Sequence, residues 1–179
     1  MPTAVADYDE AMIGRSARTL SLMIAASAAL AACGSLPPAR GSAAALGGQR
    51  PQVSDQGREV VMFALALIDT GYRFGGKNPA AGLDCSGMVS YVYSHAVGIN
   101  LEGSAADIAR AGRPVEAADM RPGDLVFFNT ENRSHSHVGI YIGGGRFVHA
   151  PSSGGRVRTD DLTQGWFAGR FEEARSYLN

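Results

Sequence analysis

The spacing of apolar residues predicts helices in the first half of residues 54–179. Ser54 or Asp55 can cap a helix whose apolar residues recur at every third or fourth position until Gly71 ends it. These recurring residues are Val61, Ala64, Leu65 and Ile68. A second helix is predicted over residues 85–97, and Gly98 ends it, since glycine is common just after a helix.

Shorter segments connect these helices to the rest of the chain. Residues 72–76 form a predicted bend and residues 77–83 a predicted loop. Ser104 and Asp107 are spaced as a capping box, which opens a short helix that runs to residue 111. Residues 129–136 are polar and are predicted to form another loop.

Turn signals and alternating residues predict strands in the second half. The run Arg121-Pro122-Gly123-Asp124 precedes a predicted strand over residues 125–128. A β-hairpin is predicted over residues 137–150, with glycines 143–145 between its strands, and another strand over residues 157–159. Helices that precede a group of strands favour an α+β fold with an antiparallel sheet.

The first 33 residues have the layout of a secretory signal. Arg15 and Arg18 precede an apolar stretch over residues 20–32, which is short for a membrane span. Residues 30–33 (Leu-Ala-Ala-Cys) resemble the lipobox of bacterial lipoproteins, which implies cleavage before Cys33 and acylation of that residue. An uncleaved membrane anchor is the alternative. Gly34 is not the aspartate that favours inner-membrane retention, so the resemblance implies an outer-membrane anchor facing the periplasm.

Composition separates a tether from a folded domain. Residues 34–53 contain few large apolar side chains, cannot bury enough surface to order themselves, and are predicted to form a flexible tether. The folded domain is expected over residues 54–179. The chain is 45% hydrophobic, enough for a core, and its net charge of −1 gives no electrostatic footprint for nucleic acid.

Cys85 is the leading candidate for a reactive side chain. It is one of two cysteines and stays unpaired if Cys33 is acylated. Its predicted place in the first turn of a helix is expected to lower its pKa, because unpaired N–H groups there favour the thiolate. The N–H groups of Cys85 and Ser86 can also form part of an oxyanion hole.

His137 and His149 can supply the base and the group that orients it. They lie on the two strands of the predicted hairpin, where a two-residue turn alone would place them on opposite faces. A three-residue loop or a bulge would bring both to one face. His137 is then expected to accept the thiol proton. His149 is expected to form a hydrogen bond with the ring nitrogen of His137 that faces away from the thiol.

The region from about Gly71 to Leu162 resembles the NlpC-type cell-wall cysteine peptidases, which are small papain-like enzymes. The matching segments are Tyr72-Arg73-Phe74-Gly75-Gly76, Leu83-Asp84-Cys85-Ser86-Gly87, Arg121 to Phe128, Ser136-His137-Val138-Gly139-Ile140-Tyr141 and Phe147-Val148-His149-Ala150-Pro151. The resemblance implies an endopeptidase that hydrolyses stem-peptide or cross-link amide bonds of peptidoglycan through an acyl-enzyme. The resemblance also implies that this enzyme needs no metal or other cofactor.

The resemblance also implies roles for individual residues. Cys85 matches the nucleophile, His137 the general base and acid, and His149 the third polar residue. Tyr72 matches a tyrosine near the nucleophile, and Asp84 and Ser86 match positions that in some relatives hold the free amine of a stem peptide. Residues 101–104 (Leu-Glu-Gly-Ser) depart from the pattern, since many relatives carry Pro-Arg before the Ser or Thr.

Other interpretations remain open from the sequence. Cys85 can be a buried core thiol or a partner of Cys33, and His135 is a rival for the base. A zinc site is disfavoured because no Cys-x-x-Cys spacing is present. Arg73, Arg146, Arg156 and Arg158 are expected on the surface, where some can bind substrate carboxylates. A catalytically silent wall-binding scaffold, or an amidase or acyltransferase on the same fold, are the alternative functions.

Overall fold

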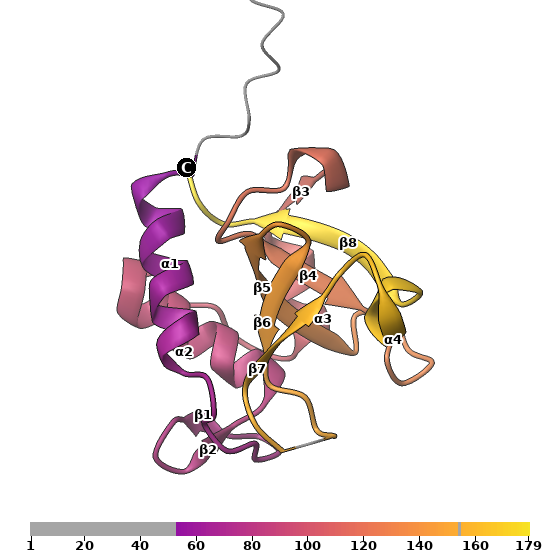
Figure 1. Cartoon of the computed structure of the whole chain (residues 1–179). Helices are drawn as coiled ribbons and strands as arrows, with labels where there is room; N and C mark the ends of the chain where they lie inside the picture. The colour runs from indigo at the N-terminus through magenta and orange to yellow at the C-terminus, as the bar shows by residue number, and fades with distance from the viewer. Residues whose placement is uncertain (1–52, 154) are drawn as a thin grey trace, which may run out of the picture. The chain divides into compact units, whose positions relative to one another are not determined.

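A computed structural model describes residues 53–153 and 155–179 of the chain. The predicted signal segment, its Cys33 and the predicted tether up to residue 52 lie outside the described residues. In the described part, helices come first and an antiparallel sheet follows, so the predicted α+β class is confirmed (Figure 1). No helix in that part is long and apolar enough to cross a membrane.

Helix α1 (Asp55–Ala66) begins as predicted but ends early. The Ser54 hydroxyl accepts a hydrogen bond from the Gly57 N–H. The helix ends five residues before Gly71, because the backbone of residues 69–72 turns to pair with residues 155–157. Its buried face also differs from the prediction. Ala64 is fully buried as expected, but so is Val60, and Ile68 lies beyond the helix end and is 39% exposed.

Helices α2 (Cys85–Val97) and α3 (Ala105–Ala111) have the predicted bounds. The Asp84 carboxylate caps α2 by accepting from the Gly87 N–H, and Gly98 ends it in the left-handed conformation. Ser104 and Asp107 form the predicted capping box of α3. These ends are set by contacts between near neighbours in sequence, which is why the residue pattern located them.

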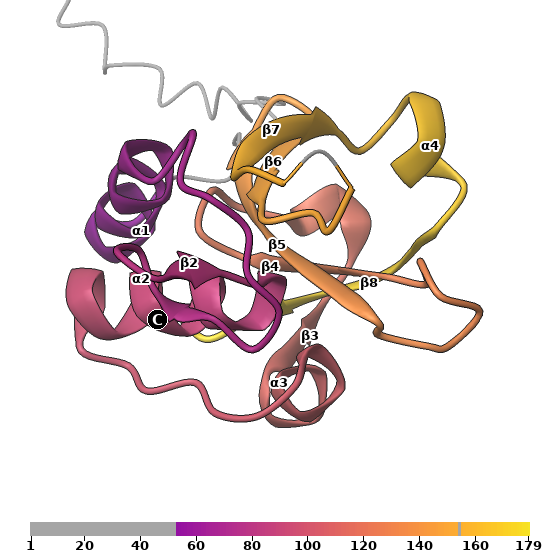
Figure 2. The ribbon, with the colours of Figure 1, turned by 90° about the horizontal axis from the view of Figure 1, so that it is seen from below.

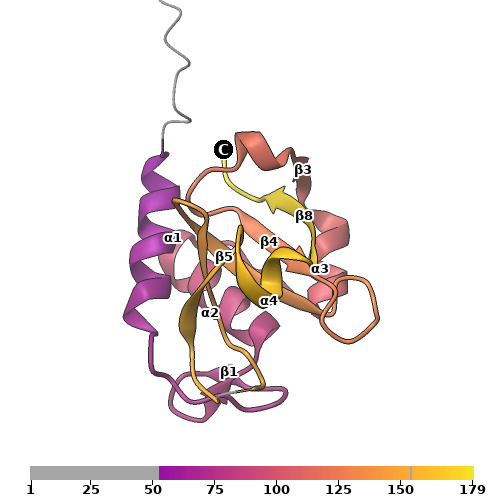
Figure 3. The same cartoon turned by 45° about the vertical axis from the view of Figure 1, so that its right-hand side comes forward.

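The main sheet has six antiparallel strands in the order β3-β8-β4-β5-β6-β7, all labelled in Figure 1. Figure 3 shows β3, β8, β4 and β5 from another side. Their bounds are β3 (Arg113–Val115), β4 (Leu125–Phe128), β5 (His137–Gly143), β6 (Arg146–His149), β7 (Arg158–Asp161) and β8 (Phe171–Ser176). Strand β7 begins one residue after the start of the predicted strand and ends two residues beyond its end. Strands β3 and β8, which pair with each other, were not predicted as strands.

Residues 77–83 are not the loop that the sequence predicts. They contain β1 (Lys77–Asn78) and β2 (Gly82–Leu83), which pair as a two-stranded ladder. Pairing over two residues leaves too short an alternation to read from the sequence. This ladder lies next to the start of α2 and contacts it.

The two faces of the main sheet are covered differently. One face packs against α1, α2 and α3 around a core that includes Leu125, Val138 and Ile140 (Figure 2). The other face carries a smaller cluster that includes Phe128 and Phe147, and the short helix α4 (Gly165–Ala168) adds Phe167 to it. The candidate site lies where the first turn of α2 meets the start of β5.

Candidate active site

The first turn of α2 holds Cys85 close to the backbone of residues 75 and 76. Gly87 permits this approach, because a Cβ on that residue would lie 1.9 Å from the Gly76 carbonyl oxygen. The Asp84 carboxylate reinforces the contact by also accepting from the Gly75 N–H at 2.8 Å. Cys85 is partly buried and forms no disulfide. Gly87 therefore has a packing reason, and so does Gly76, where a Cβ would lie 2.2 Å from the Gly82 carbonyl oxygen.

The hairpin of β5 and β6 brings His137 and His149 to the same face. Gly143 pairs with Arg146, so only Gly144 and Gly145 form the turn, and both have positive φ as a type I′ turn requires. The register then shifts between Tyr141 and Gly143. This irregularity adds the extra residue that the same-face arrangement needs, so the bulge alternative is the one the structure contains.

A continuous chain of hydrogen bonds runs from His137 through the hairpin to β7. His137 Nε2 lies 2.7 Å from His149 Nδ1, and His149 Nε2 lies 2.8 Å from Asp160 Oδ2. Arg158 Nε donates to the same carboxylate oxygen at 3.0 Å. The side chain of His149 is fully buried and His137 is 8% exposed. Phe167 packs against both rings, with its centroid 4.7 Å from that of His149.

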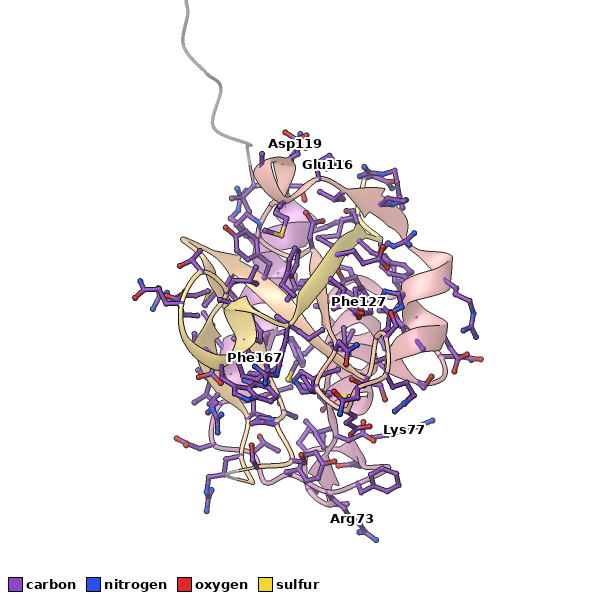
Figure 4. All side chains as sticks on the ribbon, turned by 90° about the vertical axis from the view of Figure 1, so that its right-hand side faces the viewer. Arg73, Lys77, Glu116, Asp119, Phe127 and Phe167 are labelled. Carbon is purple, nitrogen blue, oxygen red and sulfur yellow. The ribbon has the colours of Figure 1, made fainter. Side chains whose placement is uncertain are left out.

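Cys85 and His137 line one cavity of about 370 Å³. The other predicted site residues on its wall are Tyr72, Asp84 and Ser86. Charges of both signs also line it, namely Lys77, Arg133 and Glu131. Lys77 lies toward the end of the domain that carries Arg73, far from the end with Glu116 and Asp119 (Figure 4). The hydrogen bond to His149 occupies Nε2 of His137, so Nδ1 is the nitrogen left to serve this cavity.

Burial keeps both candidate reactive groups neutral at rest. It raises the pKa of Cys85 to about 11, and outweighs the backbone N–H groups of Val138 and Ser86, which favour the thiolate. The predicted net lowering of the thiol pKa at the helix start is therefore wrong. Burial also lowers the pKa of His137 to about 3, with further lowering from His149 and Arg158. A neutral thiol beside a neutral imidazole can react when the proton moves as the sulfur attacks.

Asp84 and Ser86 are tied to each other and to the helix start. The Ser86 hydroxyl donates to Asp84 Oδ1 at 3.1 Å, and the same oxygen accepts from the Gly87 N–H. Asp84 is thus a helix cap that also faces the cavity. Burial, followed by the nearby Cys85, raises the pKa of the Tyr72 hydroxyl, so Tyr72 is a neutral donor or acceptor there.

Sequence reasoning missed Asp160 and Phe167. Asp160 lies opposite Phe147 in the β6–β7 ladder, two pairs away from the pair of His149 and Arg158. Extending the predicted strand by two residues would have found it, since residues 158 and 160 share a face. Arg158 was expected on the surface; its side chain is 43% exposed, and its guanidinium also binds Asp160.

His135, the rival base, contacts acidic residues and not the hydrogen-bond chain of His137, His149 and Asp160. His135 Nε2 lies 2.9 Å from Glu173, and its backbone N–H donates to Glu172. It lines the cavity, but no hydrogen bond joins it to His149 in the described part of the chain. Across residues 53–153 and 155–179, no group of three or more His, Cys, Asp or Glu side chains is placed to hold a metal ion.

Comparison with known proteins identifies a family that matches most of the described domain. The model of the NlpC/P60 family matches residues 69–176. Murein DD-endopeptidase MepH of Escherichia coli (strain K12) is 36% identical over 110 residues, which make up 60% of this chain and 41% of MepH. The gamma-DL-glutamyl hydrolase of Bacillus subtilis (strain 168) is 39% identical over 121 residues, 67% of this chain and 29% of the hydrolase. The chain thus spans less than half the length of these curated relatives.

Solved structures resemble the domain as well. The NlpC/p60 domain of the peptidoglycan hydrolase SagA is 35% identical with a TM-score of 0.59, and covers 67% of this chain and 97% of that domain. A Staphylococcus aureus protein described as similar to lipoprotein, NLP/P60 family, is 32% identical with a TM-score of 0.62, covering 73% of this chain and 45% of that one. These likenesses confirm the predicted papain-like fold.

Proposed function

Because the chain belongs to the NlpC/P60 family, we propose that it is an endopeptidase that hydrolyses amide bonds in the peptides of peptidoglycan. One observation carries the proposal. The cavity brings together a free thiol at a helix start and a buried imidazole whose far nitrogen is bound by a second histidine. That is the arrangement a cysteine nucleophile and its base require.

In the proposed reaction, Cys85 is the nucleophile and His137 is the general base. The sulfur bonds to the scissile carbonyl carbon while His137 Nδ1 takes the thiol proton. The carbon–nitrogen bond then breaks, and the imidazolium returns the proton to the leaving amine. A water molecule attacks the resulting thioester and gives a proton to His137, which passes it to the departing Cys85 thiolate. His149 keeps the His137 ring in place throughout.

The backbone around Cys85 supports an oxyanion hole. The N–H groups of Cys85 and Ser86 both lie close enough to the sulfur to favour its charged form. They belong to the first turn of α2, where N–H groups have no partner within the helix. Each donor of this kind typically lowers a barrier by about 3 kcal/mol.

The charges around the cavity suit a substrate with both amine and carboxylate groups. We assign the amine to Asp84 and Ser86, with Tyr72 beside the scissile bond, because all three line the cavity with Cys85. Lys77 and Arg133 lie on the same wall and can bind carboxylates. The two relatives named for their reactions differ in the bond they cut, so both a bond within one stem and a cross-link between stems are candidates.

Acylation of Cys33 and a tether over residues 34–53 complete the proposal. They would hold the domain at the outer membrane, facing the periplasm and the wall. The lipobox-like residues and the lipoprotein description of the staphylococcal relative support this location in the cell envelope. Incorporation of labelled palmitate into wild type, and its loss in Cys33→Ala, is the expected result. Equal labelling of both would contradict acylation at this residue.

Incubation of the purified full chain with muropeptides tests the activity. Wild type and Cys85→Ala are compared, and mass spectrometry identifies the products. Cleavage by wild type alone is expected, and the product masses name the bond. A cut at the sugar–peptide amide, or transfer to an acceptor other than water, would instead favour an amidase or acyltransferase. If Cys85→Ala restored a mutant strain fully, a silent scaffold would replace the endopeptidase.

A further inference from the structure

A carboxylate lies at the far end of the histidine pair, outside the cavity that holds Cys85. Asp160 Oδ2 is 2.8 Å from His149 Nε2. His149 lies between Asp160 and His137, and its side chain is fully buried. The β6–β7 ladder fixes this contact, because His149 pairs with Arg158 and Asp160 is the next residue on the same face. Asp160 touches no group that would meet the substrate in the proposed reaction, so any effect it has must pass through His149.

The hydrogen-bond chain determines where the protons lie. A carboxylate only accepts hydrogen bonds, so His149 must carry its proton on Nε2. A neutral His149 then has a bare Nδ1, which can only accept. His137 Nε2, 2.7 Å away, must therefore be the donor. The neutral His137 is left with a bare Nδ1, which is the state a base for Cys85 needs.

We propose that Asp160 is a positioning residue that sets the tautomers of both histidines and so keeps His137 Nδ1 free to take the Cys85 proton. The assignment rests on the proposed function for its catalytic consequence. Its structural content, the Nε2–H tautomer of both rings, does not depend on that function.

The surroundings of the two histidines leave one carboxylate, that of Asp160, to determine which ring nitrogens carry protons. The rings of Phe147 and Phe167 pack against His149, so little other polar surface competes for its nitrogens. Asp160 and Arg158 from β7 face the pair on one side. On the other side, the charged or titratable residues that line the cavity with His137 are Cys85, Asp84, Tyr72, Lys77, Glu131, Arg133 and His135. Asp160 raises the pKa of His149, whereas burial, the larger effect, and Arg158 lower it to about 4.

Arg158 and the protein surface explain how Asp160 keeps its place. Arg158 donates to the same carboxylate oxygen as His149 and also to the Ser153 carbonyl oxygen. The Asp160 side chain is 29% exposed, toward a second cavity that Trp166 and Gln164 also line. Asp161, the next residue, accepts instead from Thr163 and Gln164. It is therefore a matched control for the loss of one negative charge.

The tautomers are the first measurement. ¹⁵N NMR of the histidine rings in the full chain should show Nε2–H for both His137 and His149 in wild type. Asp160→Asn removes the obligate acceptor, and its amide can donate to His149 Nε2, so Nδ1–H forms should appear in both rings. Asp161→Asn should leave the wild-type spectrum. An Nδ1–H form in wild type, or unchanged tautomers in Asp160→Asn, would overturn the assignment.

Kinetics on muropeptides are the second measurement. Asp160→Asn should lower kcat about 10²-fold, at the low end of what general acid–base catalysis contributes, with KM nearly unchanged. The acid limb of kcat/KM should also move to lower pH, because loss of the carboxylate lowers the pKa of His149. Asp160→Glu should recover part of kcat. A uniform loss with no shift of the limb would indicate a structural role and contradict the proposal.

Failure of the two proposals can be told apart. If wild type cleaves no muropeptide, the endopeptidase proposal fails while the ring spectra still decide the role of Asp160. If wild type cleaves but Asp161→Asn loses as much activity as Asp160→Asn, the position of Asp160 has no special effect. Circular dichroism of each variant checks that it folds. If Asp160→Asn does not fold, the ¹⁵N NMR spectrum of wild type still decides the tautomers.

Discussion

Cys85 and His137 share a cavity that disfavours the charged form of either side chain. The helix start lowers the pKa of a thiol, as the sequence suggested, but burial moves it further in the other direction. Burial thus favours the neutral thiol and the neutral imidazole, so the proposed reaction requires a proton to move from Cys85 to His137 during attack. This differs from cysteine enzymes whose thiolate is formed in advance beside an imidazolium.

The rate of Cys85 alkylation should report this resting state. Iodoacetamide reacts with the thiolate, and the pKa of Cys85 is raised to about 11, so the rate should still be rising above pH 9. The measurement is the pseudo-first-order rate of labelling from pH 6 to 11, followed by mass spectrometry. A plateau reached below pH 8 would mean a preformed thiolate. His137→Gln provides the control, because an ion pair would make the profile depend on that residue.

Asp84 caps helix α2 and also brings a negative charge to the cavity. Two substitutions separate these roles. Asp84→Asn keeps an oxygen that can accept from the Gly87 N–H, whereas Asp84→Ala loses every acceptor and should cost about 1 kcal/mol of unfolding free energy or more. Both should raise KM for peptides with a free amine, if Asp84 binds that amine. Urea unfolding and kinetics on free and N-acetylated peptides measure the two effects. Equal KM values for both peptides in wild type would rule out the amine contact.

At the scale of elements, the approach of α2 to residues 75–76 holds the nucleophile in place. Gly87→Ala would place a methyl group 1.9 Å from the Gly76 carbonyl oxygen, so the helix start must move. We expect a loss of about 1–3 kcal/mol in unfolding free energy from this overpacking. Urea unfolding of Gly87→Ala is compared with Ser94→Ala, an exposed position of the same helix. Equal stability of the two variants would contradict the close-approach argument.

Elements whose ends depend on near neighbours were predictable from the sequence. Ser54, Gly98 and the Ser104 capping box set helix ends through contacts within a few residues. Strands β3 and β8 were missed because they pair across about sixty residues and carry no clear alternation of their own. The early end of α1 was missed for the same reason, since residues 155–157 cause it.

In the candidate site, too, features set by local sequence were predictable and features set by distant segments were not. The sequence motifs placed Cys85, His137 and His149 together, and the hairpin parity argument named the bulge as one of two ways to align the histidines. Asp160 was missed because its role arises from the register of β7 against β6, which no local pattern specifies. The pKa of Cys85 was misjudged because the extent of burial at a helix start depends on packing from distant elements.

At the scale of the whole molecule, the buried site links stability to pH at both ends of the range. His137 and His149 have folded pKa values lowered from 6.5 to about 3 and about 4. Below pH 6.5 the unfolded chain therefore binds protons that the folded chain does not. Cys85 acts at the other end, because its pKa is raised from 9.0 to about 11 and the unfolded chain releases that proton first. Burying the site neutral thus costs stability in acid below pH 6.5 and in alkali above pH 9.

The acid side of this window gives a sharp test. As the pH falls from 6.5 toward 4, the unfolding free energy should decrease by up to about 1.4 kcal/mol per pH unit for each of the two histidines. Urea unfolding at pH 7, 6, 5 and 4 measures the slope. The double variant His137→Gln with His149→Asn removes both titrating groups and should flatten the slope, whatever its absolute stability. Cys85→Ala should keep the wild-type slope, since a thiol does not titrate in this range. A double variant as acid-sensitive as wild type would mean that other groups set the dependence, and that the histidine pair is not held neutral by the fold.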